Sequence, residues 1–182
     1  MPNPFREMNC YVLAGGERQR SRHFQPENGL ARLERSYRRY ATVFEKVAIV
    51  IKKDQAREKY LNFPHVCDTT AEYDIAYGVE AALKNADSKA VFIGSCDITD
   101  FPLSLAVELV KKYNGEKFLG YYDASDEAAS HQPLFGIYAK ALAPKIEEMI
   151  ERGETDLSGL MAQEGTLLPL PEDIPAASIN LR

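Results

Sequence analysis

Residues 90–102 read AVFIGSCDITDFP, an apolar run followed by Cys96, Asp97 and then Pro102. A short apolar run bounded by turn residues predicts a buried strand over residues 90–95. Pro102 is typical of a helix start, so we expect a helix through VELVKKY after it. A buried strand, a loop with a carboxylate and a helix form the repeating unit of mostly parallel sheets.

The same alternation continues on both sides of this segment. Apolar runs predict further strands over residues 10–14, 46–52, 65–67, 117–121 and 134–138, and a strand-like TLLPL at 166–170. Helical spacing of apolar residues predicts helices over residues 30–44, 54–60, 70–85 and 139–151. This order predicts a three-layer α/β/α sandwich with a mostly parallel sheet. We expect one domain over residues 1–182, with residues 1–7 as a disordered or accessory N-terminal extension.

The composition is that of a soluble globular protein, with 45% hydrophobic and 27% charged residues and a net charge of −5. These values exclude collagen-like, disordered and coiled-coil classes and argue against broad binding to nucleic acid or membrane. The chain has no apolar run of the roughly 18 to 20 residues that span a bilayer, and its first residues hold no signal region. We expect a cytoplasmic protein. Its three cysteines lack C-x-x-C spacing and are interpreted as small buried thiols.

Positive charge is concentrated near the N-terminus, where seven arginines and three glutamates lie between Glu17 and Tyr40. This excess predicts a local polyanionic partner. Within the helix expected at residues 30–44, Arg32, Arg35 and Arg39 fall away from the apolar stripe. We interpret those three as a solvated helix surface.

The segment LAGGERQRSR, residues 13–22, follows the first predicted strand directly. Gly15 and Gly16 allow a tight turn that brings backbone N–H groups close to an anion, and the arginines that follow suit phosphate oxygens. The alternative is a Gly-Gly turn followed by solvated arginines. Its place after a buried strand favours a phosphate loop, although neither G-x-G-x-x-G nor a P-loop motif occurs.

Asp97 follows the most apolar strand and is expected at the same sheet edge as Gly15. A carboxylate there suits Mg²⁺, which commonly bridges one or two carboxylates to substrate phosphates. Asp100 is a candidate to assist it. In the alternative interpretation, Asp97 or Asp100 caps the following helix.

Taken in order, these motifs resemble the MobA-like nucleotidyltransferases, and among them the molybdenum cofactor guanylyltransferases, over nearly the whole chain. The family signature Leu-Ala-Gly-Gly-x-x-x-Arg is matched by Leu13, Ala14, Gly15, Gly16 and Arg20. The family's Cys-Asp loop resembles Cys96 and Asp97, and its His-Pro-Leu segment resembles HQPLFGIY at residues 131–138. The resemblance implies a Rossmann-like, GT-A-like nucleotidyltransferase fold.

The resemblance also implies roles for individual residues. Asp97 is expected to hold the metal ion, and catalysis is expected to rest on Arg20, Arg22 and Asp97. The acceptor is expected to lie near His131 and Asn180. The residues expected to bind the nucleotide are Leu13, Ala14, Gly15, Gly16, Asn28, Asp68, Gly78 and Asp97, together with Lys53, which is expected there because it lies at the end of the second predicted strand on the same side.

Two departures from the family pattern stand out. Asn28 occupies the place of a lysine that neutralises the nucleotide's phosphates. Arg22 is our first candidate to replace that lysine, and Arg32 the second. The Pro-Gly-Pro stretch expected after Asp68 is absent, which leaves the recognised base open.

The function that this resemblance implies is Mg²⁺-dependent transfer of GMP from GTP to molybdopterin, with release of pyrophosphate. The expected partners are GTP or another nucleoside triphosphate, a molybdopterin-type phosphate acceptor, and molybdoenzymes or cofactor-biosynthesis proteins. Two alternatives stay open. One is a silent family member that binds nucleotide or cofactor as a carrier or regulator, and the other is a nucleotidyltransferase for another acceptor, such as a sugar or alcohol phosphate.

Overall fold

The computed structural model describes residues 3–14, 26–27, 30–52, 62–68, 70, 72, 74–125 and 131–181, and at 26–27, 30–31 and 131 it describes the backbone alone. The helix predicted over residues 54–60 lies outside this part of the chain. In the described part, strands and helices alternate as the sequence predicts.

The main sheet has seven strands in the order β5-β4-β1-β6-β8-β7-β9. Strand β8 runs antiparallel to both its neighbours, and the other pairings are parallel. In chain order, the strands are β1 (Asn9–Leu13), β4 (Lys46–Lys52), β5 (His65–Asp68), β6 (Ala90–Ser95), β7 (Phe118–Tyr122), β8 (His131–Ala139) and β9 (Gly165–Pro169). A mostly parallel sheet is therefore confirmed.

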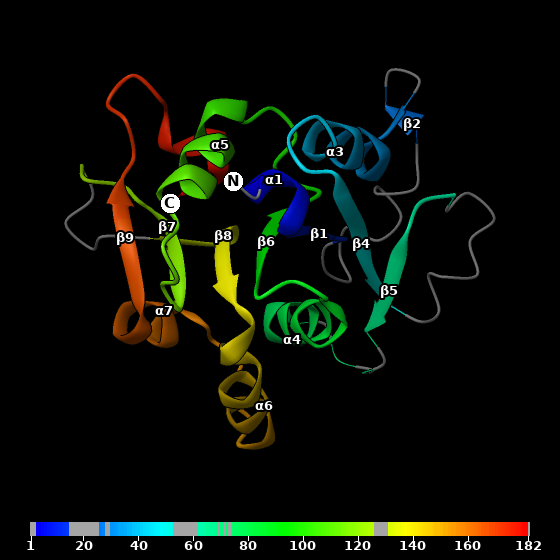
Figure 1. Cartoon of the computed structure of the whole chain (residues 1–182), viewed down its shortest axis with the longest axis vertical. Coiled ribbons are helices and arrows are strands. Elements are labelled where there is room, and N and C mark those ends of the chain that lie inside the picture. The colour runs from blue at the N-terminus through cyan, green and yellow to red at the C-terminus, as the bar shows by residue number, and fades with distance from the viewer. Residues whose placement is uncertain are drawn as a thin grey trace.

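Helices cover both faces of this sheet (Figure 1). One face carries α1 (Pro4–Glu7), α3 (Arg32–Tyr40) and α5 (Leu103–Lys112) together with the 3₁₀ turn η4 (Ala176–Ile179). The other carries α4 (Ile75–Asn85), α6 (Ala143–Glu151) and α7 (Ser158–Glu164). The three-layer sandwich is confirmed. None of the helices in the described part of the chain combines the length and apolarity that crossing a membrane requires.

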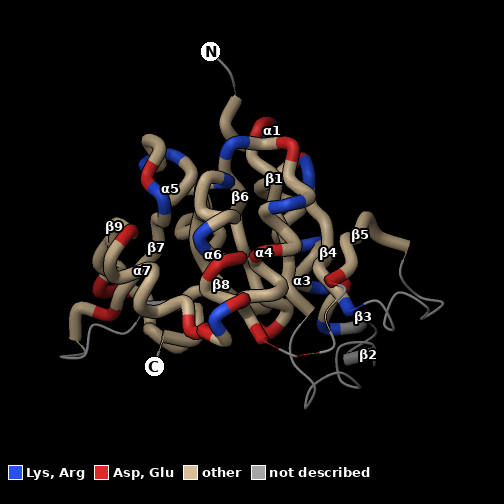
Figure 2. The backbone as a smooth tube through the Cα atoms, turned by 90° about the horizontal axis from the view of Figure 1, so that it is seen from below, with Lys and Arg blue, Asp and Glu red and all other residues tan. Residues whose placement is uncertain are grey.

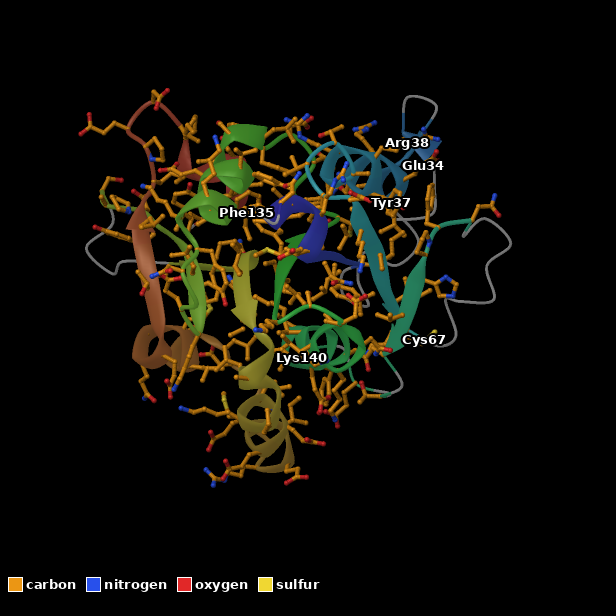
Figure 3. The ribbon with its side chains drawn as sticks, viewed as in Figure 1. Glu34, Tyr37, Arg38, Cys67, Phe135 and Lys140 are labelled. Carbon is orange, nitrogen blue, oxygen red and sulfur yellow. The ribbon has the colours of Figure 1, made fainter. Side chains whose placement is uncertain are left out.

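Strand β1 shows why two apolar layers form. Successive side chains of a strand point to opposite faces, so Cys10 and Val12 pack towards α3 and α5 while Tyr11 and Leu13 pack towards α4. Cys10 is fully buried, and burial raises the pKa of its thiol. Cys96 is also buried and Cys67, on β5 (Figure 3), is half-buried. The expectation of small buried thiols is confirmed for Cys10 and Cys96.

Three helices begin later than the sequence pattern predicts. Leu30–Ala31 forms strand β3, which pairs with β2 (Pro26–Glu27), so α3 starts at Arg32. Helix α4 starts at Ile75, because the Asp74 carboxylate accepts a hydrogen bond from the Ala76 N–H at 3.2 Å and caps it. After β8 the chain makes a 3₁₀ turn, η3 (Lys140–Leu142), and α6 begins at Ala143 with a proline in its first turn.

The ends of the central strands meet at one edge of the sheet. The Ala14 N–H donates to the Val50 carbonyl at 3.0 Å, which joins the end of β1 to β4. The Cys96 N–H donates to the Leu13 carbonyl at 3.1 Å, which joins the loop after β6 to the same end of β1. In open sheets of this kind, ligands bind outside the carboxyl ends of the strands. This edge is therefore where a functional site is expected.

Candidate active site

A cavity of about 120 Å³ opens at this edge, between the ends of β1 and β4 and the start of α4. Its walls are mainly apolar, and three charged side chains reach it. This combination is typical of small-molecule sites. The lining residues are Leu13, Ala14, Val50, Ile51, Lys52, Asp68, Asp74, Ile75, Gly78 and Leu134.

Lys52 and Asp68 form an ion pair in the cavity wall. The Lys52 Nζ lies 2.5 Å from Asp68 Oδ2 and donates to Thr70 Oγ1 at 3.0 Å. The other carboxylate oxygen, Asp68 Oδ1, accepts from the Thr70 N–H at 2.9 Å and from its hydroxyl at 2.6 Å. The Asp68 side chain is 6% exposed and that of Lys52 is 11% exposed. This network fixes the carboxylate that the sequence places near a nucleotide.

Lys52 is a residue that sequence reasoning missed. Lys53 was expected to touch the nucleotide, and it lies outside the described residues. Because strand side chains alternate, Lys52 shares the face of Val50, which packs towards α4 and the cavity. That alternation is the signal that points to Lys52 in the sequence.

Gly78 allows α4 to approach the end of β1. A Cβ atom on Gly78 would lie 2.8 Å from Leu13 Cδ2. Both residues line the cavity, so the width of the cavity depends on this close approach. The structure thus places Gly78 with Leu13, Ala14 and Asp68, three of the four other described residues expected to bind a nucleotide.

Asp97 lies one strand away from the cavity. Strand β6 pairs with β1, and its last residue, Ser95, lies opposite Leu13. Asp97 comes two residues after Ser95, in the loop that follows β6. The Ser95 hydroxyl accepts a hydrogen bond from the Asp97 N–H at 3.1 Å, and the Asp97 side chain is 26% exposed. The structure thus brings Asp97 to the same edge of the sheet as Leu13 and Ala14, which begin the glycine-rich segment, as the sequence predicts.

Helix α3 packs its polar side onto the loop that carries Asp97. Arg32 Nη1 lies 3.2 Å from Asp97 Oδ1, and the Ser36 hydroxyl donates to the Cys96 carbonyl at 3.0 Å. Arg39 Nε donates to the Phe101 carbonyl at 3.0 Å. The interpretation of Arg32 and Arg39 as a solvated surface is therefore wrong, because the loop after β6 covers that face.

The outward side of α3 is solvated, as expected for a helix on the surface. Arg38 pairs with Glu34 one turn earlier at 2.7 Å, and both lie on this helix in Figure 3. Figure 2 shows the Lys and Arg positions in blue on α3 and on the neighbouring β4. Arg32 and Arg38 of this helix are each paired with a carboxylate, Asp97 and Glu34 respectively.

The capping alternative for Asp97 and Asp100 is not supported. Helix α5 has Pro102 at its N-cap, with no side-chain hydrogen bond to the helix. Asp100 is exposed and its carboxylate accepts from the neighbouring Thr99 hydroxyl at 2.9 Å. Neither carboxylate therefore caps the start of α5.

The donor set at Asp97 fits a Mg²⁺ ion that arrives with phosphates. In the part of the chain that the structure describes, no three His, Cys, Asp or Glu side chains form a metal-binding group. Mg²⁺ is usually held by one or two carboxylates, with substrate phosphates and water completing its coordination. A single, partly exposed carboxylate one strand from the cavity meets that description.

The two residues expected at the acceptor site lie close together in the fold. Asn180 follows η4 with a left-handed backbone (φ 55°), and its carbonyl accepts a hydrogen bond from Gln132 Nε2 at 3.0 Å. His131 is the neighbour of Gln132 at the start of β8. A second cavity of about 260 Å³ shares Asp74 and Ile75 with the first and extends to Pro133.

The remaining predicted site residues lie outside the described part of the chain. They are Gly15, Gly16, Arg20, Arg22, Asn28 and Lys53. Their roles stay predictions.

Comparisons with known proteins agree with this geometry. Residues 10–167 match the model of the MobA-like NTP transferase domain. A protein of Aquifex aeolicus (strain VF5), named as a probable molybdenum cofactor guanylyltransferase, is 32% identical over 94% of this chain and 84% of its own length.

Solved structures give the same result for the fold. The crystal structure of Aq1419 from Aquifex aeolicus VF5 covers 96% of this chain and 92% of its own, with a TM-score of 0.74 and 26% identity. Molybdopterin-guanine dinucleotide biosynthesis protein A from Archaeoglobus fulgidus covers 89% of this chain and 83% of its own, with a TM-score of 0.73 and 18% identity. The latter match supports the fold alone.

Proposed function

Since this chain belongs to the MobA-like NTP transferase family, we propose that it transfers GMP from GTP to the terminal phosphate of molybdopterin and releases pyrophosphate. One observation carries the proposal: Asp97 lies one strand from a cavity lined by Leu13, Lys52 and Asp68. Adjacent strands are about 4.8 Å apart, so the ends of β4 and β6 are separated by about 10 Å. A nucleoside triphosphate spans that distance.

The nucleoside would occupy the cavity, with its phosphates directed towards Asp97. The apolar walls suit a base, and Asp68 is held in one orientation by Lys52 and Thr70. We propose that the backbone at Gly15 and Gly16, with Asn28 and Lys53, completes this binding site. Arg20 and Arg22 would neutralise the phosphates from the loop after β1.

In the reaction, an oxygen of the acceptor phosphate attacks the α-phosphorus of GTP. The new P–O bond forms as the bond between the α-phosphorus and the bridging oxygen to the β-phosphate breaks, and pyrophosphate leaves with that electron pair. Mg²⁺, when bound at Asp97, supplies positive charge to the phosphates. The chain's own contribution is to align two polyanions, because little proton transfer is required.

We place the acceptor on the β8 side of the cavity. The Gln132 side chain, next to His131 in the chain, donates to the Asn180 carbonyl, and the second cavity, beside Pro133, shares Asp74 and Ile75 with the first. A cytoplasmic location and interaction with molybdoenzymes or cofactor-biosynthesis proteins would follow from this activity.

The test is pyrophosphate release from GTP, molybdopterin and Mg²⁺. Asp97→Asn is expected to lower turnover by at least about a hundredfold, because the neutral amide is a poor metal ligand. Asp87→Asn is the matched control, since Asp87 lies at the opposite end of β6 and pairs with Lys46 on the surface. If GTP stabilises the wild-type protein and no pyrophosphate is released, the chain is a nucleotide-binding protein without this activity. Stronger stabilisation by CTP or ATP would indicate a transferase for another substrate.

A further inference from the structure

Arg32 occupies a position in α3 that helix stability does not explain. It is the first residue of the helix, where the partial positive charge of the helix N-terminus disfavours a cation. Arg38 and Arg39 lie at the other end, where that charge is negative and cations are favoured. Glu34 also lies in the first turn, but its carboxylate pairs with Arg38, so another negative group beside Arg32 is needed to offset its placement.

Asp97 supplies that negative charge. The guanidinium Nη1 of Arg32 lies 3.2 Å from Asp97 Oδ1, and the two side chains are 31% and 26% exposed. Both groups are thus in contact with each other and also within reach of a ligand. The pairing occupies an oxygen of the carboxylate that suits a metal ion.

The position of Arg32 is fixed by the rest of α3. The hydroxyl of Ser36, which is fully buried, donates a hydrogen bond to the carbonyl of Cys96, the residue before Asp97. Arg39 donates a hydrogen bond to the Phe101 carbonyl. The helix and the loop after β6 therefore form one unit, and the Arg32 guanidinium stays beside Asp97 without a rearrangement of the backbone.

We propose that Arg32 is a phosphate-binding residue of this site, held by Asp97 in the free protein. A guanidinium binds phosphate oxygens in a bidentate manner, and Asp97 exchanges its contact with Arg32 for a divalent cation that arrives with the phosphates. The Arg32 guanidinium then exchanges the Asp97 carboxylate for phosphate, and the carboxylate exchanges the guanidinium for the cation, so neither is left without an opposite charge. This inference rests on the proposed function, because it assigns Arg32 to the phosphates of the same nucleotide.

The test separates anion binding from metal binding. Pyrophosphate without metal, and Mn²⁺ without nucleotide, are titrated by calorimetry into wild-type protein and Arg32→Met. We expect pyrophosphate to bind roughly ten- to a hundredfold more weakly, since a charge-assisted hydrogen-bonding group is lost. We expect Mn²⁺ to bind several-fold more tightly, because the substitution removes a cation that competes for Asp97 Oδ1.

Arg38→Met is the matched control. It removes the same charge from the same helix, on the side where Arg38 pairs with Glu34 (Figure 3), and should change neither affinity appreciably. Arg32→Lys keeps the charge, loses the bidentate geometry and is expected to bind pyrophosphate with intermediate affinity. It provides the test if Arg32→Met does not fold.

Unchanged pyrophosphate binding in Arg32→Met, weaker Mn²⁺ binding, or an equal loss in Arg38→Met would each overturn the assignment. If the binding results are as expected and GTP with molybdopterin gives no pyrophosphate in the wild type, the proposed reaction fails while the role of Arg32 in anion binding stands.

Discussion

Lys52 and Asp68 are register partners at the ends of β4 and β5, and their charged groups are 2.5 Å apart in a largely buried setting. Lys52 also donates to the Glu72 backbone carbonyl, so one ammonium group joins two strands to the segment that leads into α4. The hydrogen bond from Tyr77 to Glu72, 2.5 Å long, raises the pKa of Tyr77 to about 12. The wall of the cavity between β1, β4 and α4 therefore depends on a charged network.

Lys52→Met should destabilise the protein by about 3 to 5 kcal/mol, because it leaves the Asp68 carboxylate buried without its cation. The measurement is the free energy of unfolding in urea. Lys46→Met is the control, since Lys46 pairs with Asp87 on the surface, where both side chains are more than half exposed. Its cost should stay below about 1 kcal/mol.

A double variant separates two effects of Lys52→Met, the unpaired charge left on Asp68 and the lost packing of the lysine side chain. Lys52→Met with Asp68→Leu removes both charges and should recover much of the lost stability. It should nevertheless fail to bind GTP, if Asp68 contacts the nucleotide. Equal losses in Lys52→Met and Lys46→Met would show that Asp68 is not buried in solution.

The sequence predicts the strands well because their signal is local. The bounds of residues 46–52 and 90–95 are both confirmed, since an apolar run identifies a buried strand without knowledge of its neighbours. The side-chain assignment was less successful, because Lys52 and Lys53 look alike in sequence. Only the alternation along β4, combined with the position of α4, distinguishes the residue that faces the cavity.

The arginines of α3 show what a helical pattern cannot predict. The pattern correctly places Leu33 on the buried side, but Tyr40, which it does not place on the apolar stripe, is buried as well. It does not reveal that the loop after β6, 60 to 62 residues later in the chain, packs onto Ser36 and Arg39. That contact depends on the sheet order, in which β6 lies next to β1, and sheet order is a property of the whole fold.

Gly78→Ala tests whether the approach of α4 to β1 sets the width of the cavity. The added Cβ would come within 2.8 Å of Leu13 Cδ2, so the leucine side chain must move. A helical alanine is more stable than glycine by about 1 kcal/mol, which offsets part of that strain. We expect a change in unfolding free energy within about 1 kcal/mol, together with weaker GTP binding by calorimetry.

Gly159→Ala is the control for that experiment. Gly159 lies in α7, and nothing lies within 4 Å of a Cβ added there. This variant should be more stable than the wild type by roughly 0.5 to 1 kcal/mol and should bind GTP normally. Unaltered GTP affinity in Gly78→Ala would contradict a nucleotide site between β1 and α4.

Ser36→Ala tests the contact between α3 and the loop that carries Asp97. The lost hydrogen bond to the Cys96 carbonyl is buried and 3.0 Å long, so we expect a cost of about 1 to 3 kcal/mol in unfolding free energy. Thr42→Ala removes an exposed hydroxyl that donates to the Arg39 carbonyl, and should cost less than about 0.5 kcal/mol. The carbonyl that accepts this hydrogen bond belongs to Cys96, the residue before Asp97. Mn²⁺ binding should therefore weaken in Ser36→Ala and stay constant in Thr42→Ala.

Glu164 gives the fold a pH-dependent contribution away from the site. Its carboxylate accepts a hydrogen bond from Lys117 at 2.5 Å and another from Lys145, and these bonds lower its pKa from 4.5 to about 2. Because the pKa is lower in the folded than in the unfolded chain, the unfolded chain binds the proton first as pH falls. The stabilisation is therefore complete above about pH 4.5 and is lost as pH falls towards 2.

Glu164→Gln should accordingly be less stable than the wild type at pH 7, with the difference shrinking between pH 4.5 and 3. The measurement is the urea midpoint of both proteins at a series of pH values, with Glu151→Gln on α6 as a control of equal net charge. High salt should reduce the difference at pH 7, because Lys117 and Lys145 are 58% and 42% exposed and are screened by ions. A difference that stays constant down to pH 3 would show that the two lysines do not hold this carboxylate in its charged form.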